Sequence, residues 1–534
     1  MGENDKLHNL RHSLAHLLAA AVLEMYPDAK NTIGPFIEDG FYYDFDFQTP
    51  GVKNSPTPGV ADLPKIEKKM KEILKSWKEF ENTEKTENEA KEHFKKNEYK
   101  VELIDEIIGK GEKITFYKCG DFTDLCRGGH LENPAKEIKP DSFKLDRVAG
   151  AYWRGNEKNK MLTRIYGLAF ETKEKLEEYI KMREEAEKRD HKKLGKELGL
   201  FIFHETAPGM PYWLPKGFII YKELENYWRK EHKKNGYLEI SSPLVNKMEL
   251  WKISGHWDHY KDDMFIADMG ENEVYGIKPM NCPNAMIVFK SIQVSYKDLP
   301  LRFSDTDRLH RYERSGVLNG LFRCRSFQQD DSHNFITEEM IEDEYRKIME
   351  ICKEFYGIFN LEYKFRLGTR PERFLGDIET WNKAEKALRD VLEKSGKEYS
   401  IAEGDGAFYG PKIDIIMKDA IGRDWQMGTM QLDFQQPRRF ELEYMDKDGK
   451  KKTPAVIHRV IYGSLERFIG ILIEHYAGAF PLWLSPVQVK VIPISEDKHL
   501  DYASEVFKIL KKNDIRVELD ESNESLSKKI RNAK

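Results

Sequence analysis

Residues 304–335 constrain the fold of this chain more than any other stretch. Two segments of alternating apolar and polar character flank a polar loop that contains Ser315, Gly316, Asn319 and Gly320. Alternation with a period of two predicts strands, and a glycine-containing connection between two such runs predicts a β-hairpin. We therefore expect the chain to build a sheet around this hairpin.

The same hairpin is densely charged. The side chains crowded onto it are Arg308, Arg311, Glu313, Arg314, Arg323, Arg325, Gln329, Asp330, Asp331 and His333. A guanidinium group binds phosphate through two hydrogen bonds and does not lose its charge. Carboxylates beside such a cluster suit a ligand with both charge signs, such as an amino acid or a nucleotide–metal complex. The alternative, which applies to any charged hairpin, is a solvated surface held by weak salt bridges.

Length, charge and cysteine content limit the class of protein. A chain of 534 residues is too long for one hydrophobic core, so we expect about two to four domains. Its net charge of −5 provides no overall attraction for nucleic acid, so any RNA contact has to come from a local patch. Five cysteines and no signal peptide predict a reducing, cytoplasmic setting. No apolar run reaches the ~18 residues of a membrane span, so we predict no membrane segment.

Residues 1–170 predict an α+β domain. Residues 7–25 have the apolar periodicity of a helix. His12 and His16 lie four residues apart in this segment and therefore on one face of the helix. Strands are expected at residues 114–117 and 143–148, with the segment from Cys126 to His130 between them.

Residues 171–198 predict one long, charged helix that connects the first domain to the next, which spans residues 199–485. Helices are expected at 217–235 and 338–356, strands at 237–241, 407–416 and 424–434, and a passage from strand to helix at 456–470. Alternation in two of these strands lets a sheet present polar side chains to a ligand. They are Lys412, Asp414, Gln426, Thr429 and Gln431.

Residues 486–534 predict a small α/β unit. The expected elements are a strand at 487–494, a helix at 497–513, a strand at 515–519 and a helix that begins near Leu526. Two such β–α steps bury too little apolar surface for a stable domain. We therefore expect only part of a domain here.

Three separated segments resemble the motifs of one enzyme class. Residues 311–313, Arg-Tyr-Glu, are followed by the loop and Arg323, an order that resembles motif 2 of the class II aminoacyl-tRNA synthetases. The run Phe-Gln-Gln-Asp-Asp-Ser-His that ends at His333 is similar to that of the threonyl-tRNA synthetase family. The helix–strand order that ends at Pro243 resembles motif 1, the dimerisation element, and residues 456–470 resemble motif 3.

The resemblance extends from His12 to about Lys534 and implies both a fold and a function. The implied fold is a class II antiparallel-sheet catalytic core with helices, preceded by an α+β editing domain and followed by a partial α/β anticodon-binding domain. The implied function is a threonine–tRNA ligase, which activates L-threonine with ATP, transfers it to tRNA(Thr) and hydrolyses mischarged seryl-tRNA(Thr). A cytoplasmic homodimer that uses Mg²⁺ with ATP is implied as well.

The resemblance also implies roles in the catalytic domain. Arg311 would hold the α-phosphate of ATP, Glu313 the adenine amino group, and Arg323 the γ-phosphate side. Phe327 and Arg467 would enclose the adenine base by stacking and a cation–π contact. In-line attack of the threonine carboxylate on the α-phosphate would then depend on positioning and charge neutralisation. The other implied residues, for catalysis or for binding substrate and ATP, are Lys412, Met280, Gln329, Asp331, Tyr409, Gln426, Thr429 and Gln431.

A zinc site is implied by the resemblance and not by spacing. Cys282, His333 and His458 are far apart in sequence, and each alone is more often a core or surface residue. In the family, a cysteine and two histidines at these positions bind one Zn²⁺ per subunit, which contacts the amino acid through an open ligand position. A site built around the threonine hydroxyl should reject valine by roughly 10⁴-fold or more. The chain departs from the family at residues 282–285, where Cys-Pro-Asn-Ala replaces the usual Cys-Pro-Gly-His.

Serine keeps the hydroxyl group, and its missing methyl is worth only ~1–3 kcal/mol, so a second, hydrolytic site is expected. The pairs His12/His16 and Cys126/His130 resemble the editing domain of the threonyl-tRNA synthetases. Lys100, Asp124 and Tyr43 are at further matching positions. The alternative is a four-ligand zinc site, as in the alanyl relatives. A metalloprotease is disfavoured, because Ser13 stands where its motif has glutamate.

Three other functions fit the sequence less well than a threonine–tRNA ligase. A synthetase-like RNA-binding or regulatory protein would be favoured by loss of a motif arginine or zinc ligand, and none is lost. A free-standing trans-editing hydrolase is disfavoured by the intact ATP motifs. A class I synthetase is disfavoured because its His-Ile-Gly-His type signature is not found.

Overall fold

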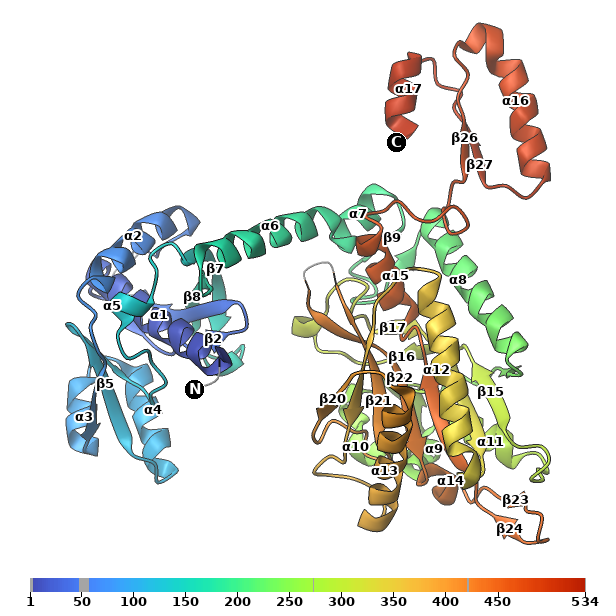
Figure 1. Ribbon diagram of the computed structural model, residues 1–534, viewed down its shortest axis with the longest axis horizontal. Helices are drawn as coiled ribbons and strands as arrows, with labels where there is room; N and C mark the ends of the chain where they lie inside the picture. The colour runs from blue at the N-terminus through green and yellow to red at the C-terminus, as the bar shows by residue number, and fades with distance from the viewer. Residues whose placement is uncertain (1–2, 48–56, 272, 420–421, 534) are drawn as a thin grey trace. The chain divides into compact units, whose positions relative to one another are not determined.

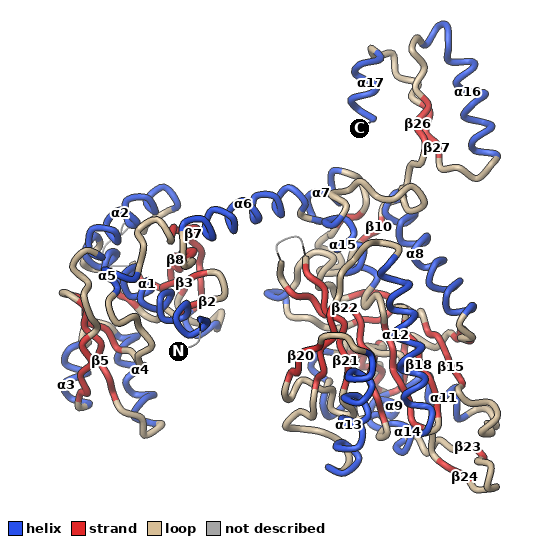
Figure 2. The backbone as a smooth tube through the Cα atoms, in the orientation of Figure 1, coloured by secondary structure: helices blue, strands red, loops and turns tan. Residues whose placement is uncertain are grey.

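The computed structural model describes residues 3–47, 57–271, 273–419 and 422–533 (Figures 1 and 2). The chain divides into two compact units, Met1–Arg183 and Glu184–Lys534. Within these described ranges, no helix is long and apolar enough to cross a membrane.

The first unit is an α+β fold. Its helices are α1 (Glu3–Met25), α2 (Leu63–Leu74), α3 (Glu87–His93), α4 (Glu98–Gly109) and α5 (Pro134–Glu137). Its strands are β1 (Lys30–Asn31), β2 (Phe36–Ile37), β3 (Gly40–Asp46), β4 (Glu81–Lys85), β5 (Ile114–Cys119), β6 (Phe122–Leu125), β7 (Phe143–Tyr152) and β8 (Met161–Ala169). The helix and the two strands expected from the sequence are confirmed.

Helix α1 packs on the larger of two sheets in this unit. The order of the five-stranded antiparallel sheet is β1–β3–β8–β7 with β2 on β3, and β4, β5 and β6 form the other sheet. Leu14, Leu18 and Val22 of α1 are fully buried in one cluster with Phe41 and Phe45 of β3. Because these leucine and valine side chains recur at helical spacing, one face of α1 is apolar and covers the sheet.

The helix expected over residues 171–198 is two helices, α6 (Lys173–Arg189) and α7 (His191–Glu197). The break lies at Asp190, whose φ of −49° and ψ of 120° are not helical. Its carboxylate accepts a hydrogen bond from the backbone N–H of Lys192 and caps α7. The expectation of one helix is therefore wrong, because charged periodicity does not reveal that an internal aspartate can act as a cap.

The second unit is built on an eight-stranded sheet. In spatial order the strands are β11 (Leu238–Ile240), β15 (Leu301–Asp305), β18 (Asp331–Ile336), β25 (Ala455–Val460), β22 (Asp424–Asp433), β21 (Lys412–Lys418), β19 (Lys364–Gly368) and β20 (Tyr399–Ala402). The six central strands pair antiparallel, as expected, whereas both edge strands pair parallel with their neighbours. A parallel pair needs a crossover connection, which α13 (Ile378–Ser395) provides between β19 and β20.

The second unit also contains smaller elements. The other helices are α8 (Pro215–Lys234), α9 (Met248–Ser254), α10 (His256–His259), α11 (Cys282–Lys290), α12 (Ile341–Gly357), α14 (Gln436–Arg439), α15 (Leu465–His475), α16 (Glu496–Lys512) and α17 (Leu526–Ala533). The other strands are β9 (Phe201–Ile202), β10 (Tyr212–Trp213), β12 (Val245–Lys247), β13 (Ile266–Asp268), β14 (Val274–Ile277), β16 (Arg308–His310), β17 (Ser326–Gln328), β23 (Tyr444–Met445), β24 (Lys451–Lys452), β26 (Val489–Val491) and β27 (Val517–Leu519).

The two faces of the eight-stranded sheet have different environments. Ile413 and Ile457 point into the main core, which α8, α12, α13 and α15 complete; Figure 1 shows α12 and α13 in front of the sheet. Their neighbours Lys412 and His458 point to the opposite, polar face, because successive residues of a strand alternate. The strand expected at 407–416 begins only at Lys412, directly after Pro411, which has no N–H for a ladder hydrogen bond.

The hairpin expected around residues 304–335 is confirmed. Its inner arms are β16 and β17, in which Leu309 pairs with Phe327. Its outer arms are β15 and β18, which join the main sheet with Asp305 opposite Asp331. The hairpin starts from the second and third strands of the sheet, and residues of its loop line the polar face.

Candidate functional site

A pocket of about 640 Å³ lies on the polar face of the main sheet. All the catalytic-domain residues assigned from the sequence line it except His333, which is fully buried beside His458. The lining residues are Met280, Cys282, Arg311, Glu313, Arg323, Phe327, Gln329, Asp331, Tyr409, Lys412, Gln426, Thr429, Gln431, His458 and Arg467. The fold therefore brings together residues from four separate stretches of sequence.

Three arginines reach the pocket. Arg311 and Arg323 come from the hairpin loop, and Arg467 comes from the first turn of α15. Arg323 Nε donates to Glu313 Oε2 over 3.0 Å, and the Arg311 guanidinium lies 5.0 Å from the ring centroid of Phe327. The Arg467 guanidinium donates to two main-chain oxygens, over 2.8 Å from Nε and 2.5 Å from Nη1. The pocket thus contains fixed cations suited to phosphate.

Two other arginines of the hairpin do not line this pocket. Arg308 pairs with the buried Glu466 of α15 over 3.4 Å. Arg325 donates to the main-chain oxygen of Glu313 over 2.8 Å and so closes the loop. Their part in the site is to shape the hairpin.

Asp414 is the centre of a second group of pocket residues. It is fully buried and accepts hydrogen bonds from Lys412 Nζ at 2.9 Å, Gln426 Nε2 at 2.7 Å and Thr429 Oγ1 at 3.1 Å. Arg366 also donates to it, over 3.1 Å. The strand alternation placed Asp414 on this face next to Lys412, and the cross-strand register with β22 adds its contacts with Gln426 and Thr429.

Two aromatic residues were missed by the sequence reasoning. Phe322 and Trp425 line the pocket with ring centroids 4.8 Å apart. The Arg467 guanidinium lies 5.4 Å from the Trp425 ring. In the sequence, Phe322 stands directly before Arg323. An aromatic residue at such a position can belong either to a pocket wall or to the core, so the sequence alone does not assign it.

Cys282, His333 and His458, the core cluster, place their donor atoms within 4.8 Å of one another. Cys282 begins α11, and the two histidines are cross-strand partners on β18 and β25. Both ring nitrogens of His333 and Nδ1 of His458 are buried, with no hydrogen-bond partner among the described residues. Buried polar atoms are normally paired, so these orphaned nitrogens fit a metal ion. One thiolate and two imidazoles fit zinc with an open position.

A carboxylate orients one of these histidines. His458 Nε2 lies 2.9 Å from Asp433 Oδ2. Burial disfavours a charged imidazole, yet Cys282 and Asp433 raise the pKa of His458 to about 10. Burial, with repulsion from His458, holds the pKa of His333 well below its ordinary value. Such carboxylate–histidine pairs are typical of metal ligands, and sequence spacing gave no signal for Asp433.

The first unit holds a second group, the N-terminal cluster of His12, His16, Cys126 and His130, with donor atoms within 4.8 Å of one another. Cys126 Sγ lies 3.5 Å from Nε2 of both His12 and His130. The His130 ring stacks on Phe80 with centroids 4.0 Å apart and an interplanar angle of 15°. The two histidine–cysteine pairs recognised in the sequence are therefore one constellation.

Asp124 links this cluster to Lys100 and Tyr43, the other two residues assigned with it. It lies 3.5 Å from His16 Nδ1 and 2.5 Å from Lys100 Nζ, and it accepts a short hydrogen bond from Tyr43 OH. Asn31, which the sequence reasoning missed, donates to Tyr43 OH over 3.1 Å. All five side chains are buried, so the cluster rests on a rigid polar network.

The charges of the N-terminal cluster are strongly coupled. Burial opposes ionisation of Cys126, yet hydrogen bonds with the three histidines lower the pKa of its thiol to about 3. Burial opposes protonation of His16, yet Asp124 and Cys126 raise its pKa to about 9. Burial disfavours the Asp124 carboxylate, but Lys100 and His16 hold its pKa well below the ordinary value. The resting state is therefore a thiolate beside an imidazolium.

Comparisons with known families cover most of the chain. The model of the tRNA synthetase class II core domain (G, H, P, S and T) matches residues 265–476. The model of the anticodon binding domain matches residues 488–534. The model of the threonyl and alanyl tRNA synthetase second additional domain matches residues 114–166.

Similar proteins share this architecture. The threonine–tRNA ligase of Acetivibrio thermocellus is 53% identical over 98% of this chain and 81% of its own length. That of Fusobacterium nucleatum is 52% identical over 98% of this chain and 83% of its own length. A crystal structure of the RNA binding domain of threonyl-tRNA synthetase from Cryptosporidium parvum matches with a TM-score of 0.62 and 44% identity, over 64% of this chain and 86% of that one. The chain belongs to the threonine–tRNA ligase family of class II aminoacyl-tRNA synthetases.

Proposed function

We propose that the pocket on the main sheet forms threonyl-adenylate from L-threonine and ATP, and that the N-terminal cluster hydrolyses mischarged seryl-tRNA(Thr). As a member of its family, the chain is a threonine–tRNA ligase. One observation carries the residue assignments: arginines suited to phosphate line the same pocket as Cys282 and His458, two of the three residues of a Cys/His cluster suited to an amino acid.

The ATP end of the pocket is assigned to the hairpin loop and α15. Arg311 binds the α-phosphate and Arg323 the γ-phosphate side, while Glu313 receives the adenine amino group. Phe327 and Arg467 enclose the base, which suits a flat ring between an aromatic face and a guanidinium plane. Arg323 and Glu313 both line the pocket and are hydrogen-bonded to each other over 3.0 Å, which supports placing ATP at this end. Mg²⁺ enters with the ATP phosphates.

The threonine end is assigned to the core cluster and its neighbours. Cys282, His333 and His458 would hold one zinc ion per subunit, which supplies a Lewis acid with an open position for the amino and hydroxyl groups of threonine. Asp331, buried and lining the pocket, accepts from the ammonium group. Met280, Tyr409 and the amides and hydroxyl group of β22 surround the rest of the amino acid and the adenylate.

In the activation step, the threonine carboxylate must lie in line with the P–O bond between the α-phosphate and the departing pyrophosphate. Arg311 neutralises charge on the α-phosphate while the carboxylate oxygen forms the new P–O bond and pyrophosphate departs with its electron pair. Lys412, held by Asp414 over 2.9 Å, contributes a second fixed cation. A ribose hydroxyl of the tRNA 3′ end then attacks the adenylate carbonyl, and AMP leaves.

Editing is assigned to the N-terminal cluster. The His16 imidazolium can give a proton to the leaving ribose oxygen, and the neutral imidazole of His130, whose pKa is lowered by burial, can take one from the water that attacks the seryl ester. Asp124, Lys100 and Tyr43 keep His16 in place through the short contacts described above. The alternative for these four side chains is a metal site, which metal analysis distinguishes.

The proposed partners follow from the family and from one exposed edge. We propose a cytoplasmic homodimer that binds tRNA(Thr). The edge strand β11 and the segment after it expose apolar side chains: Leu238 is 55% exposed, Leu244 41% and Val245 51%. An unpaired apolar strand edge suits pairing with a second copy.

Amino-acid-dependent ATP–pyrophosphate exchange tests the proposal. We expect exchange with threonine, weaker exchange with serine and none with valine, because valine lacks the hydroxyl group. Absence of threonine-dependent exchange in a folded, zinc-loaded sample would refute the activation step and favour a regulatory, tRNA-binding role.

A further inference from the structure

We propose that Asn281 is a positioning residue for the amino-group end of the threonine site, acting through Asp331. The inference rests on the threonine-activating function proposed above and adds a side chain that does not itself line the pocket. Asn281 is fully buried, directly before the pocket residue Cys282.

One amide group joins two strand ends at the pocket. Asn281 Nδ2 donates to Asp331 Oδ2 over 3.0 Å and to the main-chain oxygen of Asp305 over 3.2 Å. Asp305 and Asp331 are cross-strand partners at the ends of β15 and β18. A carboxylate oxygen and a carbonyl oxygen can only accept hydrogen bonds. The amide group must therefore turn its nitrogen toward both of them, which fixes its orientation.

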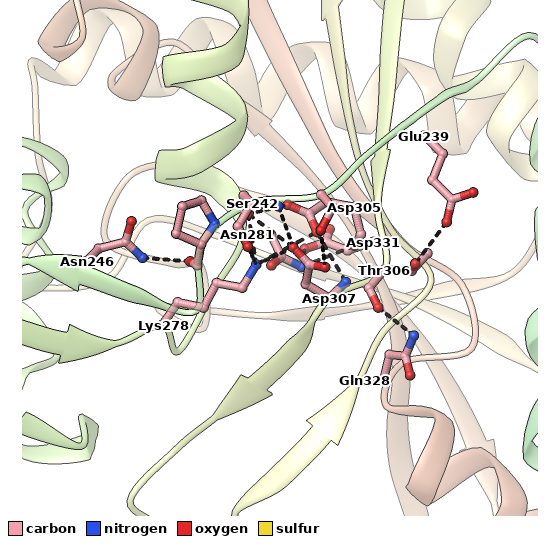
Figure 3. Close-up of polar contacts among 12 residues, drawn as sticks. Glu239, Ser242, Asn246, Lys278, Asn281, Asp305, Thr306, Asp307, Gln328 and Asp331 are labelled. Atoms are coloured by element: carbon pink, nitrogen blue, oxygen red, sulfur yellow. Dashed lines mark hydrogen bonds and ion pairs between the residues drawn. The ribbon is translucent and has the colours of Figure 1, made fainter. Parts of the chain in front are cut away.

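The segment that carries Asn281 is itself anchored. Lys278 Nζ donates to Ser242 Oγ and to Asp307 Oδ2, each over 2.8 Å (Figure 3). The main chain of Lys278 donates to Leu244 O over 2.9 Å and accepts from His310 N over 3.1 Å. The segment therefore cannot move without breaking the ion pair between the buried Lys278 ammonium group and the half-buried Asp307, which holds Asn281 beside Asp331.

The two buried asparagines near this site differ in the carboxylate that each one binds. The nitrogen of Asn281 donates to Asp331, the carboxylate that lines the pocket. The nitrogen of Asn334 donates to Glu344, which does not line it. Among the described residues, the Oδ1 atoms of both side chains are buried without a partner, so the unpaired oxygen does not separate the two roles and the donor contact does.

The chemistry explains why this hydrogen bond affects threonine and not ATP. An ammonium group is recognised by a carboxylate held in place, and a loss of about 0.5 Å in placement is enough to weaken such a site. Asn281→Ala releases Asp331. Asn281→Asp keeps the shape of the side chain but replaces the donor by a second acceptor, which repels Asp331.

The test is pyrophosphate exchange with Asn281→Ala and Asn281→Asp. We expect the KM for threonine to rise roughly tenfold in the alanine variant and further in the aspartate variant, with the KM for ATP nearly unchanged. The KM for serine should rise in parallel, because serine carries the same ammonium group. A purely structural role would instead lower the thermal unfolding midpoint in both variants and leave the KM for threonine unchanged.

The matched control is Asn334→Asp. Asn334 is also fully buried and donates to a carboxylate, Glu344, over 2.8 Å, but it points to the other face of β18. We expect it to lower the thermal unfolding midpoint as much as Asn281→Asp does while leaving the KM for threonine unchanged.

Two results would overturn the inference. One is an unchanged KM for threonine in a folded Asn281→Asp protein. The other is a joint rise of the threonine and ATP KM values in the variants of both asparagines, which would indicate general loosening. If the aspartate variant does not fold, the alanine variant decides. A wild-type protein without threonine-dependent exchange would refute the proposed function itself, and this inference with it.

Discussion

The core cluster and the N-terminal cluster use the same residue types with different partners. In the core cluster, neither ring nitrogen of His333 has a hydrogen-bond partner within the described residues. In the N-terminal cluster, Cys126 lies 3.5 Å from both His12 and His130, and Asp124 lies 3.5 Å from His16. Among the described residues, His16 Nε2 and His130 Nδ1 are also buried without a partner, so each of these two histidines pairs through only one of its ring nitrogens. Proximity of cysteine and histidine therefore does not by itself define a metal site; the partners of each nitrogen do.

The largest expected effect is that of Cys282→Ala. Removal of the thiolate should abolish zinc binding and threonine activation, because two imidazoles hold the ion far more weakly. Metal content and pyrophosphate exchange measure both. Cys352→Ala is the control, since Cys352 is buried in the main core and should keep both properties. Normal activation by the Cys282 variant would show that the comparison is wrong.

His12→Ala should leave activation intact and cause seryl-tRNA(Thr) to accumulate, since it removes one of the two side chains 3.5 Å from Cys126 Sγ. Deacylation of pre-formed seryl-tRNA(Thr) measures the effect. His8→Ala is the matched control, because His8 lies one turn earlier on α1, exposed and stacked on Phe36. Clearance of serine at the wild-type rate by the His12 variant would place editing elsewhere.

Asp433→Asn should weaken zinc binding roughly 10–100-fold, the usual cost of losing a carboxylate that orients a ligating histidine. Competition with a chelator gives the affinity. The substitution keeps the shape of the side chain and removes its charge at the 2.9 Å contact with His458 Nε2; the same carboxylate also accepts from the backbone N–H groups of Gln435 and Gln436. An unchanged affinity would mean that His458 is oriented by the sheet alone.

The smallest expected effect is on the pH dependence of Cys126 alkylation, which should be nearly absent. An ordinary thiol reacts with iodoacetamide about tenfold faster per pH unit below its pKa, because the thiolate is the nucleophile. With its pKa near 3, Cys126 is already a thiolate, so its alkylation rate should stay nearly flat from pH 5 to pH 8. Mass spectrometry of the labelled cysteine measures this rate.

The control for that experiment is His16→Ala. Loss of the imidazolium raises the pKa of Cys126, so the rate should again increase with pH. A wild-type Cys126 that zinc protects from alkylation would favour the metal-site alternative for the N-terminal cluster.

Much of the fold could be predicted because it depends on local periodicity. The alternation around Lys412 and Gln431 predicted strands and the polar face that forms the pocket. The same local reasoning failed at Asp190. The charge pattern predicts one continuous helix there, but the Asp190 carboxylate caps a new helix and divides it in two.

Contacts between segments far apart in the sequence could not be predicted. Asp414, Asp433 and Asn281 each fix a pocket residue on another strand. The partners of Asp414 and Asp433 are set by sheet register and that of Asn281 by the packing of its loop, neither of which a short-range pattern encodes. The grouping of Cys282 with His333 and His458 likewise came from family resemblance, because their separation in the sequence carries no ligand spacing.

Metal analysis of three proteins tests the central claim most directly: the wild type, Cys282→Ala and Cys126→Ala, each reconstituted with zinc and freed of excess ion. If only the core cluster is a metal site, the wild type and Cys126→Ala hold about one zinc ion per chain and Cys282→Ala holds none. Two ions in the wild type, or an ion that Cys282→Ala keeps and Cys126→Ala loses, would contradict the account.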